Sequence, residues 1–206
     1  MSLNNNIILT GLIVSLCSTA LGKPKKFDEV NDGYTKVVST VDGSSPLFGL
    51  WKNAKDQQLL AELPRGWERK KFFIAVTPSA GVKFAGLQGN EAYVYLRKYG
   101  DRIAFISPEV SVRSTGDKSS KDSVHTIFTD KVMLDVPIVA TGPSGQPVID
   151  LDNLLVGKAS KIAGSVASGA NSQLASIKKA KSFPKNLEVA FEMPTSGGKL
   201  KTIHYS

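Results

Sequence analysis

Cysteine is nearly missing from this chain of 206 residues: Cys17 is its single thiol. Cys17 lies in a leading segment that we expect to be removed, which leaves 206 − 22 = 184 residues without cysteine. One disulfide needs two cysteines, so the mature chain must be stabilised by burial of its core. A chain of this length buries roughly 70% of its unfolded surface, which is enough for one domain. The lack of cysteine also excludes a thiol nucleophile.

Charge is missing from the first 22 residues, whose side chains are all neutral. An apolar run over 7–16 precedes small residues and Ala20-Leu21-Gly22, which is the pattern of a secretory signal peptide cleaved after Gly22. A membrane anchor is the first alternative, but the apolar run is shorter than the roughly 20 residues that span a bilayer. The second alternative is lipid attachment at Cys17. Lipid-attachment processing favours a small residue directly before the cysteine, and Leu16 is not small. We expect an exported protein, periplasmic, cell-surface or secreted, with no transmembrane segment after cleavage.

Histidine is scarce, and the two histidines, His125 and His204, are 204 − 125 = 79 positions apart. Catalytic zinc needs several converging ligands, typically in His-Glu-x-x-His, and this motif is missing. The segment around Asp150 and Asp152 lacks the glycine and distal glutamate of a calcium loop, so a helix cap is the better interpretation. The sequence predicts no catalytic residue, no metal ligand and no cofactor in this chain.

Arginine is absent after position 157, and acidic residues are rare there. This part of the sequence contains eight lysines and only two acidic residues, Glu188 and Glu192. This segment supplies six of the eight net positive charges. The candidate residues for binding an anionic surface are Lys178, Lys179, Lys181 and Lys185. The alternative is an ordinary solvated face. Few aromatic residues are interleaved for base stacking, which argues against nucleic acid as a partner.

The hydrophobic spacing predicts one β-rich α+β domain over 23–206, with mainly antiparallel sheets, hairpins and two or three short helices. Hairpins are expected over 47–64 and over 91–107, where Gly100-Asp101 forms the turn. Further strands are expected over 72–78, 124–140, 147–151, 187–193 and 199–206. Helices are expected over 27–39, 152–162 and 174–181, a single helical turn over 67–71, a surface loop over 114–123, and a flexible connection over 164–172.

Several segments resemble one protein family when they are taken in order: LLAELP (59–64) with KKFFIAVT (70–77), AYVYLRKYGDRIAFISP (92–108), PVIDLDNLL (147–155), and SIKKAKSFPKNLEVAFEMP (176–194) ending in TIHYS (202–206). They are similar to the N-terminal domain of large exported bacterial zinc-dependent metalloproteases. The resemblance runs from about residue 27 to 206. Its most specific part is the stretch 183–189 followed by His204-Tyr205-Ser206.

The resemblance implies a zincin catalytic domain with His-Glu-x-x-His beyond this region, and it therefore implies that the chain is truncated at its C-terminal end. No zinc ligand or catalytic glutamate of the family has a matching position here. Zinc is expected only in that catalytic domain, which would be the partner in cis or in trans. We expect this chain alone to be inactive.

Two further hypotheses remain open. The chain is alternatively a stand-alone exported binding module that holds an anionic surface polymer or a protein partner on its lysine-rich face. The third hypothesis is an inhibitor of a related protease, which applies if the domain is a prosegment in its relatives.

Overall fold

The computed structural model of the chain describes residues 25–38, 40 and 42–206. The predicted signal peptide over 1–22 lies outside these residues. The described strands form a single antiparallel sheet of eleven strands, accompanied by a few short helices. This confirms the prediction of a β-rich, mainly antiparallel chain, and most of its regular structure is strand.

The strands follow one another as β1 (Tyr34–Lys36), β2 (Gly49–Asn53), β3 (Leu59–Glu62), β4 (Lys71–Ala80), β5 (Glu91–Tyr99), β6 (Arg102–Ser107), β7 (Lys131–Thr141), β8 (Pro147–Asp150), β9 (Ser176–Ser182), β10 (Leu187–Pro194) and β11 (Leu200–Tyr205). Their order in the sheet is β1-β2-β3-β8-β7-β6-β5-β4-β11-β10-β9. The last strand of the chain is therefore an interior strand between β4 and β10.

The predicted hairpins are confirmed. β2 pairs with β3, and β5 pairs with β6 in the register Tyr99↔Arg102. Gly100 adopts a φ of 57° in the β5–β6 turn, a conformation that glycine reaches without a steric penalty. The alternating apolar residues Ala92, Val94 and Leu96 are all buried, as their spacing predicts.

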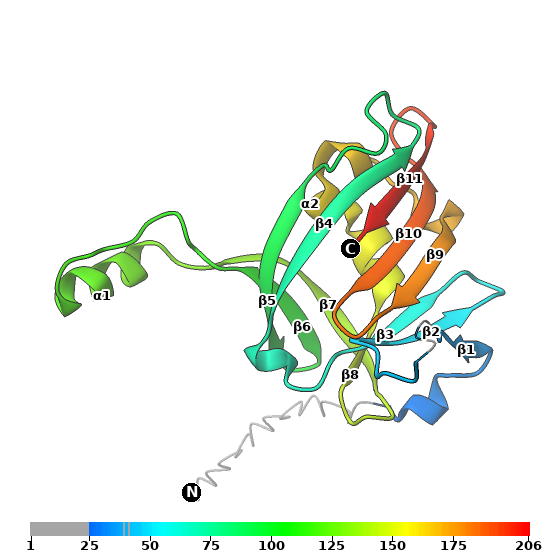
Figure 1. Cartoon of the computed structure of the whole chain (residues 1–206), viewed down its shortest axis with the longest axis horizontal. Coiled ribbons are helices and arrows are strands. Elements are labelled where there is room, and N and C mark those ends of the chain that lie inside the picture. Colours follow the sequence, from blue (N-terminus) through cyan, green and yellow to red (C-terminus); the bar gives the residue numbers. More distant parts are fainter. Residues whose placement is uncertain (1–24, 39, 41) are drawn as a thin grey trace, which may run out of the picture.

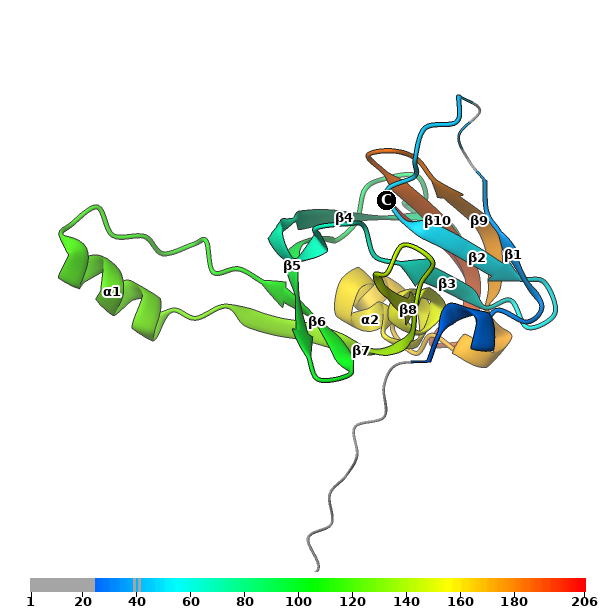
Figure 2. The same ribbon diagram turned by 90° about the horizontal axis from the view of Figure 1, so that it is seen from below.

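The sheet curls until its two ends meet (Figures 1 and 2). The backbone N–H of Leu47, just before β2, donates to the carbonyl oxygen of Phe183 at 2.7 Å. The N–H of Phe48 donates to the hydroxyl oxygen of Ser182 at 3.1 Å. These contacts join β2 to the turn after β9, and they give the sheet a concave inner face.

Helical segments fill the concave side of the sheet, as Figure 2 shows for α2. They are a π-helical turn (Asn153–Gly157), α2 (Ala159–Ala163) and a 3-10 turn (Gly164–Ala167). Leu154, Leu155 and Ile162 are buried in the same core as the strands. The helix predicted over 152–162 is present in this broken form. The flexible connection predicted from 164 onward is wrong at its start, because Ala167 is fully buried.

The core is one large apolar cluster inside the curl. The side chains of Ile103, Val136, Phe191 and Ile203 within it are inaccessible or nearly so. A smaller cluster around Phe27, which tilts against Trp51 at 4.4 Å between ring centroids, also includes buried Leu60, Ala140 and Val148.

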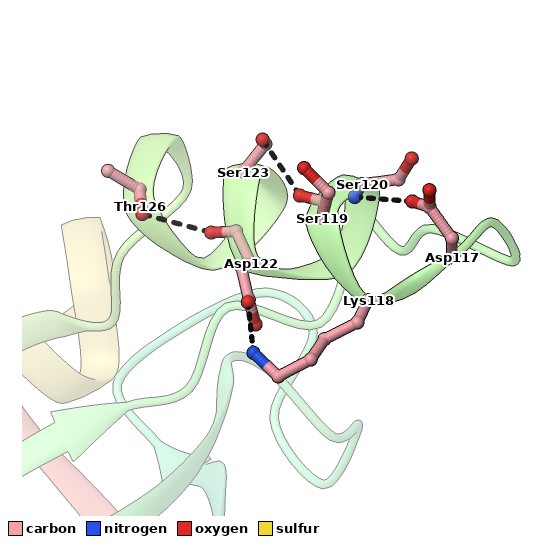
Figure 3. A network of polar contacts seen from close by, with 7 residues as sticks. All are labelled: Asp117, Lys118, Ser119, Ser120, Asp122, Ser123 and Thr126. Atoms are coloured by element: carbon pink, nitrogen blue, oxygen red, sulfur yellow. Dashed lines mark hydrogen bonds and ion pairs between the residues drawn. The ribbon is translucent and has the colours of Figure 1, made fainter.

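An arm projects from the sheet between β6 and β7 and carries α1 (Lys118–Ile127) at its tip (Figure 1). The Asp117 carboxylate caps this helix by accepting from the Ser120 N–H at 2.8 Å. Lys118 forms an ion pair with Asp122 one turn later (Figure 3). The prediction of a loop over 114–123 and a strand from 124 is therefore wrong here, although the segment is exposed. The strand begins only at Lys131.

Two predicted helices are also wrong. Over 27–39 the helix is limited to a 3-10 turn (Phe27–Glu29), because Gly33 turns the chain at a φ of 77° and Tyr34–Lys36 then pairs with β2. The stretch 174–181 forms β9 instead, because its backbone pairs with β10. Two further 3-10 turns, Trp67–Arg69 and Ser172–Leu174, complete the structure; the first confirms the predicted helical turn over 67–71.

Candidate functional site

A cavity of about 500 Å³ opens on the concave side of the sheet. It lies under the start of β4, the start of β10 and the end of β11. This volume is within the range of ligand-binding pockets in proteins, roughly 300–1,000 Å³. The walls are mainly apolar and include Phe48, Phe72, Leu96, Phe105, Leu154 and Leu187.

The β4 strand supplies one wall through its alternation. Phe72 and Ile74 point toward the cavity side, whereas Phe73 is 55% exposed on the outer face. The Phe72 ring lies against the Phe48 ring, with 5.8 Å between centroids at an angle of 47°. The cavity wall thus joins β4 to the segment before β2, although 24 positions separate the two phenylalanines in sequence.

The floor is held by the helical segment and β11. The Tyr205 hydroxyl donates to the carbonyl oxygen of Leu155 at 2.6 Å, and both residues line the cavity. Burial raises the pKa of Tyr205, which keeps its phenol protonated as a donor at neutral pH. The contact fixes the end of β11 against the π-helical turn.

The rim of the cavity is basic. Lys70, Lys71 and Lys185 line the opening with exposed side chains. Within the part of the chain that the structure describes, no ion pair involves these three lysines. The ammonium group of Lys71 lies 5.6 Å from the centroid of the Tyr93 ring. An apolar interior with an unneutralised basic rim is suited to a ligand that is apolar with a negative charge.

The four lysines predicted to bind an anionic surface are divided by the structure. Lys178 pairs with Glu192 at 2.8 Å, and Lys179 pairs with Glu188. The ammonium group of Lys179 lowers the pKa of Glu188. Lys181 on β9 and Lys185 in the β9–β10 turn are exposed. Lys185 alone of the four belongs to the cavity rim.

The two histidines lie on different elements. His125 is on α1, which corrects the prediction of a strand there. His204 is on β11, opposite Ala190 on β10 and Thr77 on β4. Its Nε2 is buried and forms no hydrogen bond with any described residue. Desolvation lowers the pKa of His204, and the positive charge of Lys179 acts in the same direction.

Of the two acidic residues at the end of β8, Asp150 caps the helical segment that follows, whereas Asp152 binds the start of β3. Asp150 accepts from the Asn153 N–H at 2.9 Å, and the Asp152 carboxylate accepts from the Leu59 N–H at 2.8 Å. Burial, together with the hydrogen bond to Asp150, raises the pKa of Asp152 to about 7. Across residues 25–206 apart from positions 39 and 41, no group of three or more His, Cys, Asp or Glu side chains is arranged to hold a metal ion.

The cavity itself was not predicted from the sequence. Its signal was present in Lys70-Lys71-Phe72-Phe73-Ile74, where two lysines precede a strongly apolar strand. Nothing in that pattern shows that Phe48 and Leu187 line the same cavity as Phe72, since this depends on the curl of the sheet. None of the helices in the described residues is both long and apolar enough to cross a membrane.

Comparison with known proteins gives one match. A family model described as a domain of unknown function (DUF5117) matches residues 86–205, which is more than half of the chain. No curated protein and no solved structure matches the chain.

Proposed function

We propose that this chain, which belongs to the family of domains of unknown function DUF5117, is the non-catalytic N-terminal domain of an exported zinc-dependent metalloprotease. In this proposal the domain binds and positions a polypeptide, and cleavage takes place in a separate zincin domain that holds the zinc, joined to it in cis or supplied in trans. We also propose that the fold is of the α+β class, which is a finer assignment than the β-rich antiparallel sheet described above.

One observation carries the proposal: the segments that resemble the metalloprotease family form the frame of the sheet. Segment 92–108 spans most of β5 and all of β6, and segment 147–155 contains β8 and the start of the π-helical turn. Segment 176–194 forms β9 and β10, and segment 202–206 covers most of β11. Three of the segments lie wholly within the matched residues 86–205. A resemblance confined to surface loops would not support a shared domain. Here the resemblance covers strands that pair with one another, which supports the proposal.

The proposal is tested with residues 23–206 alone. The purified chain is incubated with zinc and with casein or a peptide library, with and without a chelator. We expect no turnover in either case. Turnover that depends on zinc and disappears with the chelator would contradict a non-catalytic role.

A genetic test is to sequence the transcript downstream of the Ser206 codon. An open frame leading to His-Glu-x-x-His supports the proposal. Unrelated sequence after a stop codon argues against the arrangement in cis.

The second candidate is a stand-alone exported module that holds anionic polymer, and the exposure of Lys181 and Lys185 favours it. Retention on an acidic matrix should then decrease with salt, because exposed charges are screened. The double variant Lys181→Glu/Lys185→Glu should lose more retention than Lys178→Glu/Lys179→Glu, whose wild-type lysines are already paired with glutamates. Retention that neither salt nor these substitutions change would exclude this candidate.

A further inference from the structure

β5 carries three tyrosines and one arginine in a row on the outer face of the sheet. Successive residues of a strand point to opposite faces, and the alternate residues of β5 that do not enter the core are Tyr93, Tyr95, Arg97 and Tyr99. We call these four residues the tyrosine row. Tyr93 is 42% exposed and Tyr99 is 51% exposed. Every residue of β5 is paired with β4 or with β6, so the tyrosine row lies on a face of the sheet and not at an edge.

The strand next to the tyrosine row leaves the aromatic rings uncovered. On β6, Ile106 lies opposite Tyr95 and the small residue Ala104 lies opposite Arg97, and both are buried. Single exposed aromatic residues are ordinary on protein surfaces, whereas a contiguous exposed patch marks an interaction site. Three tyrosines on alternate positions of one strand form such a patch.

The central ring of the row is held in place. The Tyr95 hydroxyl donates to the Asp130 carboxylate at 2.7 Å, and Asp130 also accepts from the N–H of Glu109 at 2.9 Å. These two hydrogen bonds lower the pKa of Asp130, and the charge of Arg97 acts in the same direction without forming an ion pair. A ring that is already oriented loses little conformational freedom when a ligand binds to it.

Two cations lie over the rings without a carboxylate partner. The Nζ of Lys71 is 5.6 Å from the centroid of the Tyr93 ring, and the Cζ of Arg97 is 5.7 Å from that of the Tyr95 ring. Arg97 also donates to the Tyr99 hydroxyl at 3.5 Å. Neither cation forms an ion pair with any residue that the structure describes. The aromatic face attracts a cation but does not neutralise its charge.

Three acidic side chains lie next to the row, and each already has a partner. Glu91 accepts from the Nε2 of Gln88 at 3.1 Å, and Asp135 is paired with Arg102. Asp130 accepts the two hydrogen bonds given above. The tyrosine row and Lys71 therefore present positive charge that a negatively charged ligand would balance.

We propose that the tyrosine row binds an acidic polysaccharide, whose sugar rings stack on the tyrosines and whose carboxylate or sulfate groups pair with Arg97 and Lys71. The positive C–H groups on the face of a sugar suit the negative face of an aromatic ring, and its hydroxyls suit the phenol groups. The inference goes beyond the proposed function, because the ligand is not a polypeptide. The site is also separate from Lys181 and Lys185, since β5 and β9 are not neighbours in the sheet.

The length and spacing of the row favour a polymer of sugars. Tyr93 and Tyr99 are six positions apart on one strand, which corresponds to roughly 20 Å, so a single small anion would contact only one end. Alternate positions of a strand are roughly 7 Å apart, which is twice the roughly 3.4 Å rise between stacked bases. This spacing argues against a stacked nucleic acid strand as the ligand.

The test measures binding of residues 23–206 to polygalacturonate, alginate and chondroitin sulfate by isothermal titration calorimetry. We expect saturable binding to at least one of these acidic polysaccharides, and binding to none of them would overturn the proposal. Polyglutamate carries carboxylates without sugar rings, and dextran carries sugar rings without charge. Binding of either as tight as that of the best acidic polysaccharide would overturn the proposal, because stacking and charge are both required.

Two kinds of variant test the rings and the charge separately. Tyr93→Ala and Tyr99→Ala should each weaken binding about tenfold, because each removes a stacking surface, whereas Tyr93→Phe keeps the ring and should bind within about threefold of the wild type. The matched control is Phe84→Ala, which removes an aromatic ring that is 53% exposed and lies outside the row. A loss of binding in Phe84→Ala equal to that in Tyr93→Ala would contradict the assigned site.

Arg97→Gln tests the charge. It should weaken binding about fivefold and reduce the dependence of binding on salt, because one screened ionic contact is lost. Arg113→Gln makes the same change on the exposed part of the arm before α1 and should leave binding unchanged. Equal effects of the two substitutions would show that only the net charge of the protein matters, which would overturn the proposal.

The same measurements separate the other possibilities. Binding that is lost in Lys181→Glu/Lys185→Glu and unchanged in Tyr93→Ala would assign the polysaccharide to the lysine-rich face and overturn the assignment to the tyrosine row. Tighter binding of oligothymidylate than of every acidic polysaccharide, weakened by Tyr93→Ala, would assign the row to single-stranded nucleic acid instead. Neither result depends on whether the chain acts beside a zincin domain, so this test is independent of the one for the proposed function.

Discussion

The hydroxyl of Tyr205 donates to the carbonyl oxygen of Leu155 at 2.6 Å, and the Tyr205 side chain is buried. This contact links β11, an interior strand of the sheet, to the π-helical turn on the concave side. Tyr205→Phe removes the donor, leaves the buried carbonyl without it, and should lower the free energy of unfolding by about 1–2 kcal/mol.

Urea unfolding checks this expectation, with the midpoint lowered and the slope unchanged. Tyr93→Phe is the matched control, because the Tyr93 side chain is 42% exposed and should change the stability by less than about 0.5 kcal/mol. Equal effects of the two substitutions would show that the hydrogen bond to Leu155 does not stabilise the fold.

Glu62 is a buried carboxylate that organises the β7–β8 turn. Its Oε1 accepts from the N–H groups of Ser144 and Gln146, at 2.8 and 3.2 Å. Glu62→Ala leaves both donors without this partner and should cost about 3 kcal/mol, whereas Glu62→Gln keeps a carbonyl acceptor and should cost about 1 kcal/mol.

Thermal and urea unfolding measure the Glu62 series, with exposed Glu68→Ala as the control. Gly142 offers a second test of the same turn. A Cβ at this position would lie 2.4 Å from the Glu62 carboxylate, so Gly142→Ala should destabilise the wild-type chain and be tolerated better in the Glu62→Ala background. Additive effects would contradict this account.

Asp152 should make the protein less stable as the pH rises. Its pKa is raised to about 7 in the folded chain, whereas an unfolded aspartate titrates near 3.9. The protonated form is therefore favoured by folding, and its contribution is fully present below about pH 4 and is lost as the pH rises toward about 7.

Asp152→Asn should remove this dependence, because the amide oxygen still accepts from the Leu59 N–H and the amide nitrogen replaces the proton donated toward Asp150. We expect the melting temperature of the variant to exceed that of the wild type at pH 8 and to approach it at pH 4. Asp28→Asn, on an exposed side chain, is the control. A difference that does not vary with pH would refute the assignment to Asp152.

His204 should act in the opposite direction. Desolvation lowers its pKa in the folded chain, so below the unfolded value of about 6.5 the unfolded chain binds a proton that the folded chain does not. Stability is then complete above that pH and falls as the pH decreases through it. The charged groups that face His204 are Lys179 of β9 and Glu188 of β10.

His204→Gln should reduce the stability lost between pH 7.5 and 5.5 in urea unfolding. The matched control is His125→Gln, which makes the same change on the α1 arm outside the core. The explanation fails if the two substitutions alter the pH dependence equally.

Local patterns in the sequence predict the strands with clear alternation, but they do not predict how distant strands meet. The spacing of Val189, Phe191 and Met193 identifies β10, and the Gly100 turn identifies the β5–β6 hairpin. The stretch 174–181 is ambiguous, because a short lysine-rich segment fits either period, and pairing with β10 determines the outcome. The α1 helix was missed because its capping residue Asp117 stands in a polar run without an apolar face to bury.

The cavity was beyond local prediction for a similar reason. Its wall forms where Phe48 reaches Phe72 and the turn after β9, and residues 48 and 182 are 134 positions apart in sequence. No periodicity encodes a contact at that separation.

This long-range closure has a consequence for how the protein is made. Contacts between distant positions form late, because the chain entropy of a long loop must be lost before they stabilise the fold. While the protein is being synthesised, β2 has no closing partner until residues 182 and 183 have left the ribosome. The concave face therefore stays open to solvent until these two residues have been synthesised and can reach β2.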